Sequence, residues 1–291
     1  MSTIAIISPV RNEAHLLPQT IASMVAQTVH PDYWVIVDDG SSDATLDIAH
    51  AAAAMHSWIK VVKNTDRGKR VLGAGVIQAF KVGYNSLDIE PDFIGKLDGD
   101  ITFGPKYIET LLSHFSADPK LGAASGKVFR PEGADQVEEF MIDEMVAGQF
   151  KFYRHSCWKA IGGFVEAVMW DGIDFHRARQ LGWTTLSILH NELRLIHHRL
   201  MGSSDQNVLK GRVRWGKGQW FMGSSFFYIL ASAAFRMLEK PVGIGGMCIL
   251  GGYLSAMLRR EPRFNVLGFR SELQHWQQAR LINLIWRRQV R

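Results

Sequence analysis

Hydrophobic and polar positions follow two alternating periods along the first half of the chain. Short apolar runs typical of buried strands occupy residues 4–8, 33–37, 58–62 and 93–97. Between them, apolar residues recur at the three- and four-residue spacing typical of helices, in segments 14–27, 43–55, 72–84 and 105–115. Strands that alternate with helices predict an α/β fold, in which a mostly parallel sheet is covered by helices on both faces.

The middle of the chain has a less regular pattern. Residues 121–128 predict a strand followed by a loop, and residues 136–150 are compatible with a helix. Residues 183–189 and 193–197 predict two further strands, which we expect to be antiparallel.

The pattern changes again from about residue 212. Two uncharged runs, Gln219–Phe235 and Pro241–Leu258, are 17 and 18 residues long, slightly shorter than the roughly 20 residues of a bilayer span. Three interpretations remain open: a helical hairpin in the membrane interface, a spanning hairpin, or helices packed on the globular domain. We favour the interface, because flanking Arg and Lys side chains would meet anionic headgroups. A last amphipathic helix over 271–288 fits the same surface. The sequence therefore predicts two domains, residues 1–210 and a membrane-associating helical region, residues 211–291.

Charge is distributed unevenly between these parts. Residues 194–291 hold 16 Lys/Arg and 4 Asp/Glu, a net charge of +12, whereas the first 193 residues hold 17 and 24, a net charge of −7. The acidic part is suited to a cation, and the basic part to a polyanion or an anionic membrane surface. The two cysteines have no metal-ligand spacing, which suggests a reducing compartment. The N-terminus has no basic segment before its apolar run and predicts a strand, not a signal peptide.

Charged loops follow three of the predicted strands. They read SPVRNE (8–13), VDDGSSD (37–43) and LDGDITF (97–103). Ligands of parallel α/β sheets bind beyond the carboxyl ends of the strands. Asp98 and Asp100 fit either an ordinary Asp-Gly turn or a site for a metal and a diphosphate. Asp39 fits an Asx turn, or a carboxylate that accepts from a uracil imide or a ribose hydroxyl.

These three motifs, in this order and at these intervals, resemble the family-2 glycosyltransferases of the GT-A fold, over roughly residues 3–200. The resemblance implies a Rossmann-like, mostly parallel sheet with flanking helices, a nucleotide-sugar donor, and Mg²⁺ or Mn²⁺ on its diphosphate. Such a cation offsets the charge that develops on the leaving diphosphate. Asp100 is then the direct metal ligand and Asp98 contacts the ribose or the metal indirectly. Donor contacts are expected from the residues of the first two loops, namely Pro9, Arg11, Glu13 and Asp39.

The segment WDGIDFHRARQLGW (170–183) resembles the part of the family that supplies the catalytic base. Inversion requires a carboxylate that takes the proton of the attacking acceptor hydroxyl. Asp171 matches that position, with Arg177, Gly182 and Trp183 at the expected spacings, whereas Trp170 replaces the usual Glu. Asp174 is an alternative base on the same predicted helix, and a plain helix N-cap is the structural alternative for Asp171.

Three smaller resemblances and one glycine-containing loop add candidates. Residues 152–164 end in Gly-Gly-Phe, like the family segment that faces the donor sugar and acceptor. In IHHRLMGSS (196–204) the two histidines alternate on a strand, so only one can serve the metal, and we choose His198. Arg214 and Trp215 resemble part of the Q-x-x-R-W signature of processive synthases, with Gly211 in place of Gln, and are expected to contact donor or lipid phosphate. The loop 64–75 places Arg67 and Lys69 near the nucleotide.

We therefore expect an inverting, metal-dependent glycosyltransferase. Its expected partners are a UDP- or GDP-sugar, a lipid-linked or polysaccharide acceptor and a membrane surface, with no nucleic acid. We expect it at the cytoplasmic face of the membrane, in exopolysaccharide, cell-envelope glycan or glycolipid synthesis. The alternatives are a non-catalytic nucleotide-sugar-binding protein of the same fold and a processive polysaccharide synthase. A nucleotidyltransferase is disfavoured because SPVRNE lacks the glycines of a triphosphate loop.

Overall fold

The computed structural model describes residues 2–65, 68, 73–133, 135–199, 208–238 and 242–289. The chain forms two compact units, Met1–Leu200 and Met201–Arg291, where the sequence suggested a boundary after residue 210. Each unit is described by itself. Arg67 and Lys69 lie outside the described residues, so their predicted nucleotide contacts stay a prediction.

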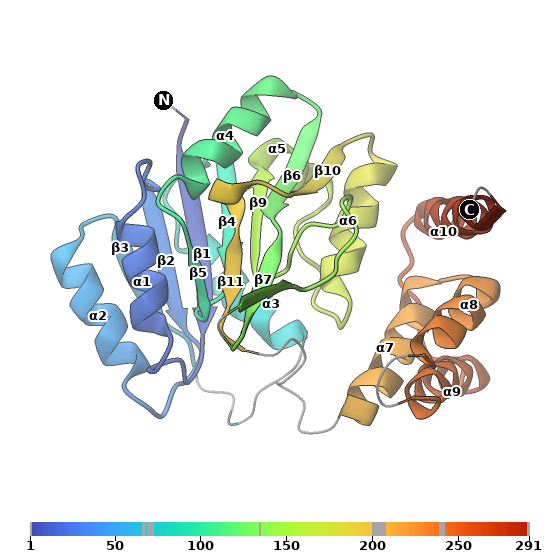
Figure 1. Cartoon of the computed structure of the whole chain (residues 1–291). Helices are drawn as coiled ribbons and strands as arrows, with labels where there is room; N and C mark the ends of the chain where they lie inside the picture. Colours follow the sequence, from blue (N-terminus) through green and yellow to red (C-terminus); the bar gives the residue numbers. More distant parts are fainter. Residues whose placement is uncertain are drawn as a thin grey trace. The chain divides into compact units, whose positions relative to one another are not determined.

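The first unit is built on a seven-stranded sheet (Figure 1) with the order β10-β6-β9-β4-β1-β2-β3. β9 is antiparallel to β4 and β6, whereas the other neighbouring pairs are parallel. Buried, β-branched residues dominate β1 and β2, as expected for strands covered on both faces. The strands are β1 (Ile4–Val10), β2 (Tyr33–Asp38), β3 (Ile59–Lys63), β4 (Phe93–Leu97), β6 (Leu121–Gly126), β9 (Phe150–Arg154) and β10 (Thr184–Ile188).

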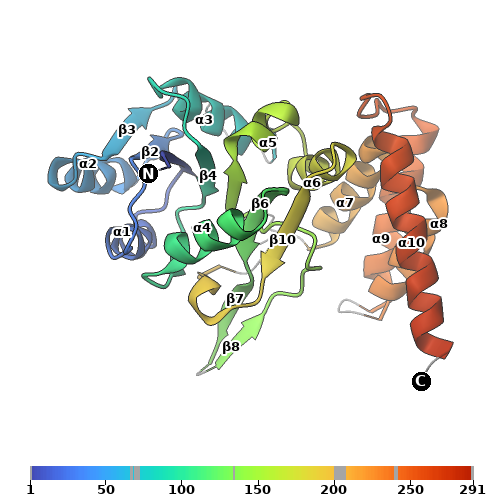
Figure 2. The ribbon, with the colours of Figure 1, turned by 90° about the horizontal axis from the view of Figure 1, so that it is seen from above.

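Helices cover both faces of this sheet (Figure 2), each with its own apolar core. One core includes Met24, Ala49 and Leu111, and the other includes Ile77 and Ala178. The helices of the first face are α1 (Leu17–Val25), α2 (Thr45–Met55) and α4 (Tyr107–Ala117), and those of the second are α3 (Ala74–Asn85), α5 (His155–Ala160) and α6 (Trp170–Gln180).

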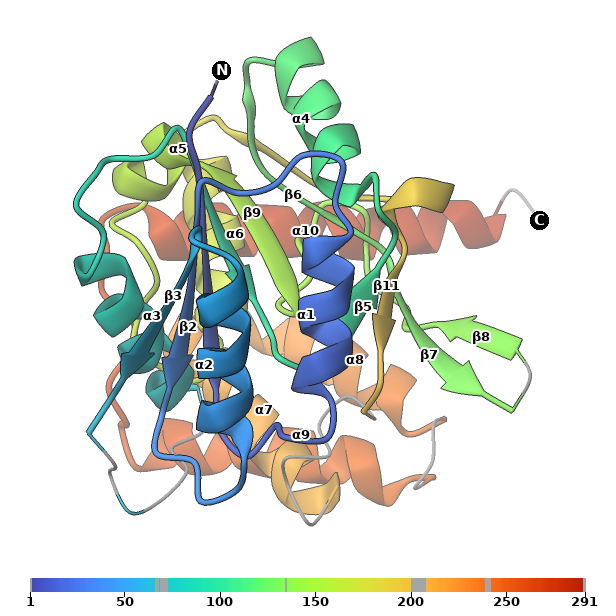
Figure 3. The same ribbon diagram turned by 90° about the vertical axis from the view of Figure 1, so that its left-hand side faces the viewer.

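A second sheet of four strands has the order β5-β11-β7-β8. Its strands are β5 (Ile101–Phe103), β7 (Val128–Glu132), β8 (Asp135–Glu138) and β11 (Leu195–His197), and Figure 3 shows the β7–β8 hairpin projecting to one side of the unit. The predicted antiparallel pairing of residues 183–189 with 193–197 is wrong. β10 joins the large sheet, and β11 joins the small one, parallel to β7 and antiparallel to β5.

The predicted helix over residues 136–150 is also wrong, because β8 and an irregular segment occupy that stretch. Side chains elsewhere in the unit form hydrogen bonds with backbone N–H and carbonyl groups that a helix would pair internally. Lys127 Nζ donates to the Met141 carbonyl at 2.9 Å, and the Ala147 N–H donates to Ser125 Oγ at 2.8 Å. These tertiary bonds override the helical spacing of the apolar residues.

The second unit consists of α7 (Val208–Met222), α8 (Phe226–Arg236), α9 (Ile244–Leu258) and α10 (Phe269–Gln289). Glycines bring α7 and α9 into backbone contact: a Cβ on Gly216 would lie 2.0 Å from the Ile249 carbonyl, and one on Gly252 would lie 2.2 Å from the Val213 carbonyl. Within the described ranges, no helix combines the length and the apolar character that crossing a membrane requires.

Candidate active site

The three charged loops meet at one edge of the large sheet. β1 pairs in parallel with β2 on one side and with β4 on the other (Figure 1), so their carboxyl ends lie together. The loops therefore place Glu13, Asp39, Asp98 and Asp100 along the same edge, where ligands of such sheets bind.

The turn between Asp98 and Asp100 lies directly against the end of β1. A Cβ on Gly99 would lie 2.9 Å from Val10 Cγ1 and 3.4 Å from Glu13 Cγ. Glycine permits this close approach, which explains its position between the two acids.

Asp100 lies beside an imidazole and a guanidinium. Its Oδ2 is 3.7 Å from His197 Nε2 and 3.6 Å from Arg199 Nε. Burial alone would raise the pKa of Asp100, but the hydrogen bond and charge of His197, together with Arg199, lower it. Burial alone would lower the pKa of the His197 imidazole, but Asp100 and Glu139 raise it to about 9.

Glu13 shares Arg199 with Asp100, since the Arg199 guanidinium also pairs with Glu13 Oε2. Burial raises the pKa of Glu13 to about 7, with Arg199 acting against the shift and the charge of Asp100 adding to it. The guanidinium thus compensates two neighbouring carboxylates.

Asp98 has a different cation as its partner. Lys96, which is buried in β4, pairs with Asp98 Oδ1 and donates to the Gly148 carbonyl at 2.8 Å. Asp98 and Asp100 thus pair with different cations, although the charges of Lys96 and His197 act on both carboxylates.

The structure places His197, not the predicted His198, beside Asp100. His198 lies one residue further, and its Nε2 is 2.9 Å from Thr102 Oγ1. Because successive side chains of a strand point to opposite faces, only one of the two rings reaches the carboxylate. The structure thus favours His197 over the predicted His198 as the ring that Asp100 could share a ligand with, and the choice between them as metal ligand stays a prediction.

The loops after β1 and β2 are joined by hydrogen bonds. Arg11 Nη1 donates to the Asp39 carbonyl at 2.7 Å, and Asn64 Nδ2 donates to Asp39 Oδ1 at 2.9 Å. Pro9 pairs with Val37 across the two strands. Arg11, Pro9 and Asp39 thus lie together, and their contacts with a donor stay a prediction.

Asp171 lies in the first turn of α6 and is partly exposed. The N-cap of this helix is Met169, so the alternative of Asp171 as a plain N-cap does not hold. Lys151 Nζ donates to the Asp171 carbonyl at 3.0 Å and fixes the backbone. Within the described part of the chain, no hydrogen bond engages the Asp171 carboxylate, and a Cβ on Gly148 would lie 3.8 Å from its Oδ2.

Asp174, the alternative base, is buried, and its carboxylate has two side-chain hydrogen-bond partners. Its side chain is 1% exposed, and its Oδ2 lies 2.5 Å from Lys151 Nζ. Tyr153 donates its hydroxyl to the same oxygen at 2.7 Å. The role of Asp174 as the alternative base stays a prediction, and in this structure its buried carboxylate is held by Lys151 and Tyr153.

Trp170, which stands where the family pattern has an acid, lies against the buried ammonium groups of two paired strand residues, Lys96 and Lys151. Lys96 Nζ is 5.3 Å and Lys151 Nζ 5.1 Å from its ring centroid. An indole face attracts cations at such distances. Trp170 therefore contacts both the cation that pairs with Asp98 and the one that pairs with Asp174.

Two further predicted segments, one in each unit, complete the list of candidates. Arg214 and Trp215 belong to α7 of the second unit, so their predicted donor contacts stay predictions. In the Gly-Gly-Phe segment, Gly162 and Gly163 have φ angles of 81° and 71°, which only glycine adopts readily. Phe164 packs edge-on against Trp170, with centroids 5.1 Å apart.

Three site residues escaped the sequence prediction: Lys96, Glu139 and Arg199. Arg199 stands inside a motif that was read for its histidines, and Lys96 directly precedes LDGDITF, where a Lys within an apolar strand was an available signal. Glu139 directly follows another acid, Glu138. No local sequence feature shows which of the two side chains belongs to the site.

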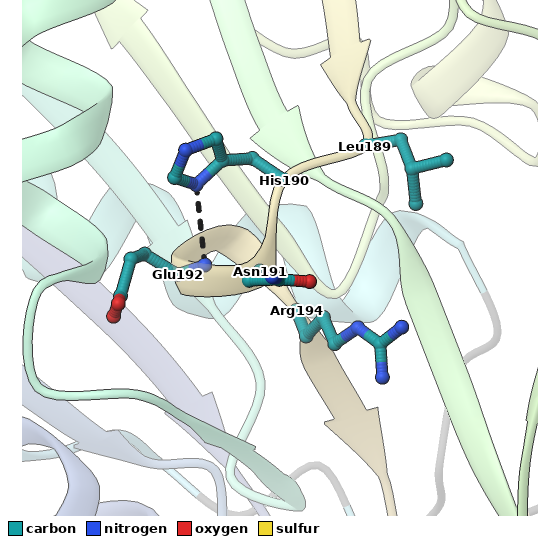
Figure 4. Close-up of a pocket in the computed structure, with 5 residues that line it drawn as sticks. All are labelled: Leu189, His190, Asn191, Glu192 and Arg194. Carbon is teal, nitrogen blue, oxygen red and sulfur yellow. Dashed lines mark hydrogen bonds between the residues drawn. The ribbon is translucent and has the colours of Figure 1, made fainter.

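An open pocket lined by polar side chains lies elsewhere on the unit (Figure 4), formed by Leu189, His190, Asn191, Glu192 and Arg194. The Glu192 N–H donates to His190 Nδ1 at 3.2 Å and closes the turn. These residues precede β11, whereas His197 ends it, roughly 10 Å further along an extended chain. The pocket therefore belongs to the opposite end of β11 from Asp100.

Acid is expected to destabilise α6 through His176. Burial, with the charge of Arg179, lowers the pKa of His176 to about 3, so below the ordinary value of about 6.5 the unfolded chain takes up a proton that the folded chain refuses. Stability should fall as pH decreases from 6.5 toward 3, with a contribution of about 1.4 kcal/mol per pH unit. Urea unfolding measured at a series of pH values should show that the free energy of unfolding of His176→Gln falls less steeply with decreasing pH than that of the wild type. His50, which is exposed on α2, supplies the control. The free energy of unfolding of His50→Gln should change with pH as it does in the wild type.

Comparison with known proteins identifies the class. Residues 5–166, more than half of the chain, match the model of "Glycosyl transferase family 2". The chain belongs to glycosyl transferase family 2.

Relatives and solved structures agree with this assignment. A poly-beta-1,6-N-acetyl-D-glucosamine synthase of Staphylococcus aureus is 28% identical over 116 residues, 40% of this chain and 26% of the relative. A validoxylamine A glucosyltransferase of Streptomyces hygroscopicus is 32% identical over 152 residues, 49% of this chain and 32% of the relative. The matches thus span about a quarter to a third of these relatives.

Among solved structures, the mannosyltransferase PcManGT of Pyrobaculum calidifontis, in complex with GDP-Man and Mn²⁺, has a TM-score of 0.56 at 14% identity, over 98% of this chain and 87% of that one. S. aureus TarS 1–349 with UDP-GlcNAc has a TM-score of 0.54 at 17% identity, over 97% and 79%. The predicted family and GT-A fold class are confirmed.

Proposed function

We propose that the protein is an inverting, metal-dependent glycosyltransferase that uses a UDP- or GDP-sugar. The observation that carries this proposal is the pair of Asp100 Oδ2 and His197 Nε2, 3.7 Å apart at the carboxyl edge of a GT-A sheet. Family membership and the binding of nucleotide-sugars by structural neighbours support it.

The residues present fit a Mg²⁺ or Mn²⁺ ion. Asp100 and His197 lie close enough to share one ion whose bonds are about 2.1 Å long. Among the described residues no cluster of three or more His, Cys, Asp and Glu side chains forms a metal site, so the donor diphosphate and water would complete the coordination. The bound ion would neutralise charge on the leaving diphosphate. Asp98 and Asp39 would hold the ribose and base.

Asp171 is proposed as the general base. Its unengaged carboxylate takes the proton of the acceptor hydroxyl. The acceptor oxygen bonds to the anomeric carbon from the far face while the bond from that carbon to the diphosphate oxygen breaks. Lys151 holds the Asp171 backbone in place, and Arg199 adds positive charge where the diphosphate departs.

The second unit is proposed to place the enzyme on the cytoplasmic face of a membrane, near a lipid-linked or glycan acceptor. Large apolar side chains are exposed along α8, after it and at the start of α9, with Arg236 at the end of α8: Phe227, Leu230, Phe235, Leu238, Val242, Ile244 and Met247. Apolar groups that insert between headgroups, with cations beside them, are typical of interfacial helices.

Vesicle binding tests this surface. Phe227 and Leu238 are 75% and 78% exposed, so Phe227→Ser with Leu238→Ser should fold normally. Each large side chain contributes about 1.5–3 kcal/mol when fully buried, so we expect binding to anionic vesicles to weaken at least about tenfold. Met55→Ser in the first unit, which also removes an exposed apolar side chain, should bind like the wild type. Equal sedimentation of all three proteins would exclude this surface.

Donor binding tests the first part of the proposal. Calorimetric titration with UDP-, GDP- and dTDP-sugars, with and without Mn²⁺, should find one nucleotide class that binds more tightly with the metal. Asp39→Ala should weaken that binding, because it removes the carboxylate held by Asn64. Failure of every nucleotide-sugar to bind would overturn the proposed function.

A processive synthase is the second candidate, since the S. aureus relative is a poly-beta-1,6-N-acetyl-D-glucosamine synthase. Product length distinguishes the two: a single added sugar supports one transfer, and a ladder supports processive addition. Tight donor binding without turnover, even with membrane lipid extract present, would instead favour a non-catalytic binding protein.

A further inference from the structure

Glu139 occupies an unusual place for an acid on an exposed hairpin. It directly follows β8, whose residues are all exposed, yet its own side chain is only 7% exposed. The Glu139 N–H donates to the Val128 carbonyl at 2.8 Å, which fixes its backbone to β7. The hairpin therefore turns one carboxylate inward while its neighbour Glu138 stays in solvent.

The inward carboxylate meets the ring of His197. Glu139 Oε2 lies 3.5 Å from His197 Nδ1, and the other ring nitrogen, Nε2, lies 3.7 Å from Asp100 Oδ2. A single imidazole thus connects the hairpin to the Asp98–Asp100 turn. β11 supports this arrangement, because it pairs with β7 on one side and with β5 on the other.

We propose that Glu139 is a positioning residue of the metal site: it accepts the Nδ1–H of His197 and so directs the Nε2 lone pair toward the ion shared with Asp100. This inference rests on the proposed function, which places the ion there. A carboxylate on the second nitrogen of a metal-binding histidine fixes the tautomer and the ring orientation, and its loss typically lowers metal affinity 10- to 100-fold. Through His197, the β7–β8 hairpin then contributes to the metal site.

Two substitutions of Glu139 distinguish its effect on the orientation of the His197 ring from the effect of its charge. Glu139→Ala removes the acceptor altogether, whereas Glu139→Gln keeps an oxygen that accepts from Nδ1–H. Glu138→Ala supplies the matched control, because it removes an adjacent acid of the same hairpin that faces solvent. Asp100→Ala reports the loss of a direct ligand.

The experiment measures free Mn²⁺ by electron paramagnetic resonance, with the full-length protein and saturating UDP or GDP, whichever binds. We expect the dissociation constant for Mn²⁺ to rise about 10- to 100-fold in Glu139→Ala and less in Glu139→Gln. Glu138→Ala should match the wild type. Melting temperatures measured without metal should be similar for Glu139→Gln and wild type, whereas a purely structural role would change the melting temperature and leave Mn²⁺ affinity intact.

The outcomes distinguish the inference from the function beneath it. If Asp100→Ala loses Mn²⁺ and both Glu139 variants keep wild-type affinity, Glu139 has no positioning role and the proposed function stands. If the wild type itself binds no Mn²⁺ in the presence of either nucleotide, the metal site and the role of Glu139 are both overturned.

Discussion

Replacing Asp171 by Asn should lower kcat for glycosyl transfer by about 10²- to 10⁴-fold, the usual contribution of a general base. Asn has the shape of Asp but cannot take the acceptor proton. Because no described hydrogen bond holds the Asp171 carboxylate, the fold should tolerate the change. Steady-state kinetics should show a lost kcat, an unchanged donor KM and an unchanged melting temperature.

Asp174→Asn supplies the contrasting variant three residues further along α6. Its carboxylate compensates the fully buried Lys151, and removing one partner of such a pair typically costs about 3–5 kcal/mol. We therefore expect Asp174→Asn to lose stability, whereas Asp171→Asn loses only turnover. Wild-type activity in Asp171→Asn would contradict the assignment of the base.

Replacing Asp100 by Ala is expected to have the second largest effect, a loss of about 10²- to 10³-fold in turnover, comparable to the removal of one group that stabilises developing charge. The substitution removes the carboxylate that, with His197, would hold the ion on the diphosphate. Turnover as a function of Mn²⁺ concentration is the measurement, and saturation should disappear or move to much higher concentration.

Asp92→Ala is the matched control for this variant. Asp92 directly precedes β4 at the end opposite Asp100, and it accepts a hydrogen bond from the Thr3 N–H at 2.8 Å. It should keep the wild-type response to Mn²⁺. An Asp100→Ala enzyme with undiminished, metal-saturable turnover would show that the ion, if present, is held elsewhere.

The sequence was most informative where short-range chemistry decides the structure. β4 was predicted residue for residue at 93–97, because its apolar run is closed by Asp and Gly, which are poor strand formers. The acids after β1, β2 and β4 were predicted to share an edge, since this follows from parallel order alone.

The remainder depends on contacts between distant residues. Strand alternation shows that only one of His197 and His198 can face Asp100 but not which one. The β5–β11 pairing decides this, with His197 opposite Ile101. Similarly, the helical spacing of residues 136–150 is overridden by bonds to Lys127 and Ser125, which no local pattern reveals.

The central claim is that the chain transfers a sugar from a nucleotide-sugar with the help of a divalent ion. In the most direct test, the purified protein is incubated in mild detergent with membrane lipid extract. UDP-, GDP- and dTDP-sugars are added in turn, together with Mn²⁺ or Mg²⁺. The test follows nucleoside diphosphate release and the anomeric configuration of the product. We predict metal-dependent release from one donor, an inverted linkage, and loss of both in Asp100→Ala and Asp171→Asn. Release that persists in both variants, or a product of retained configuration, would contradict the account.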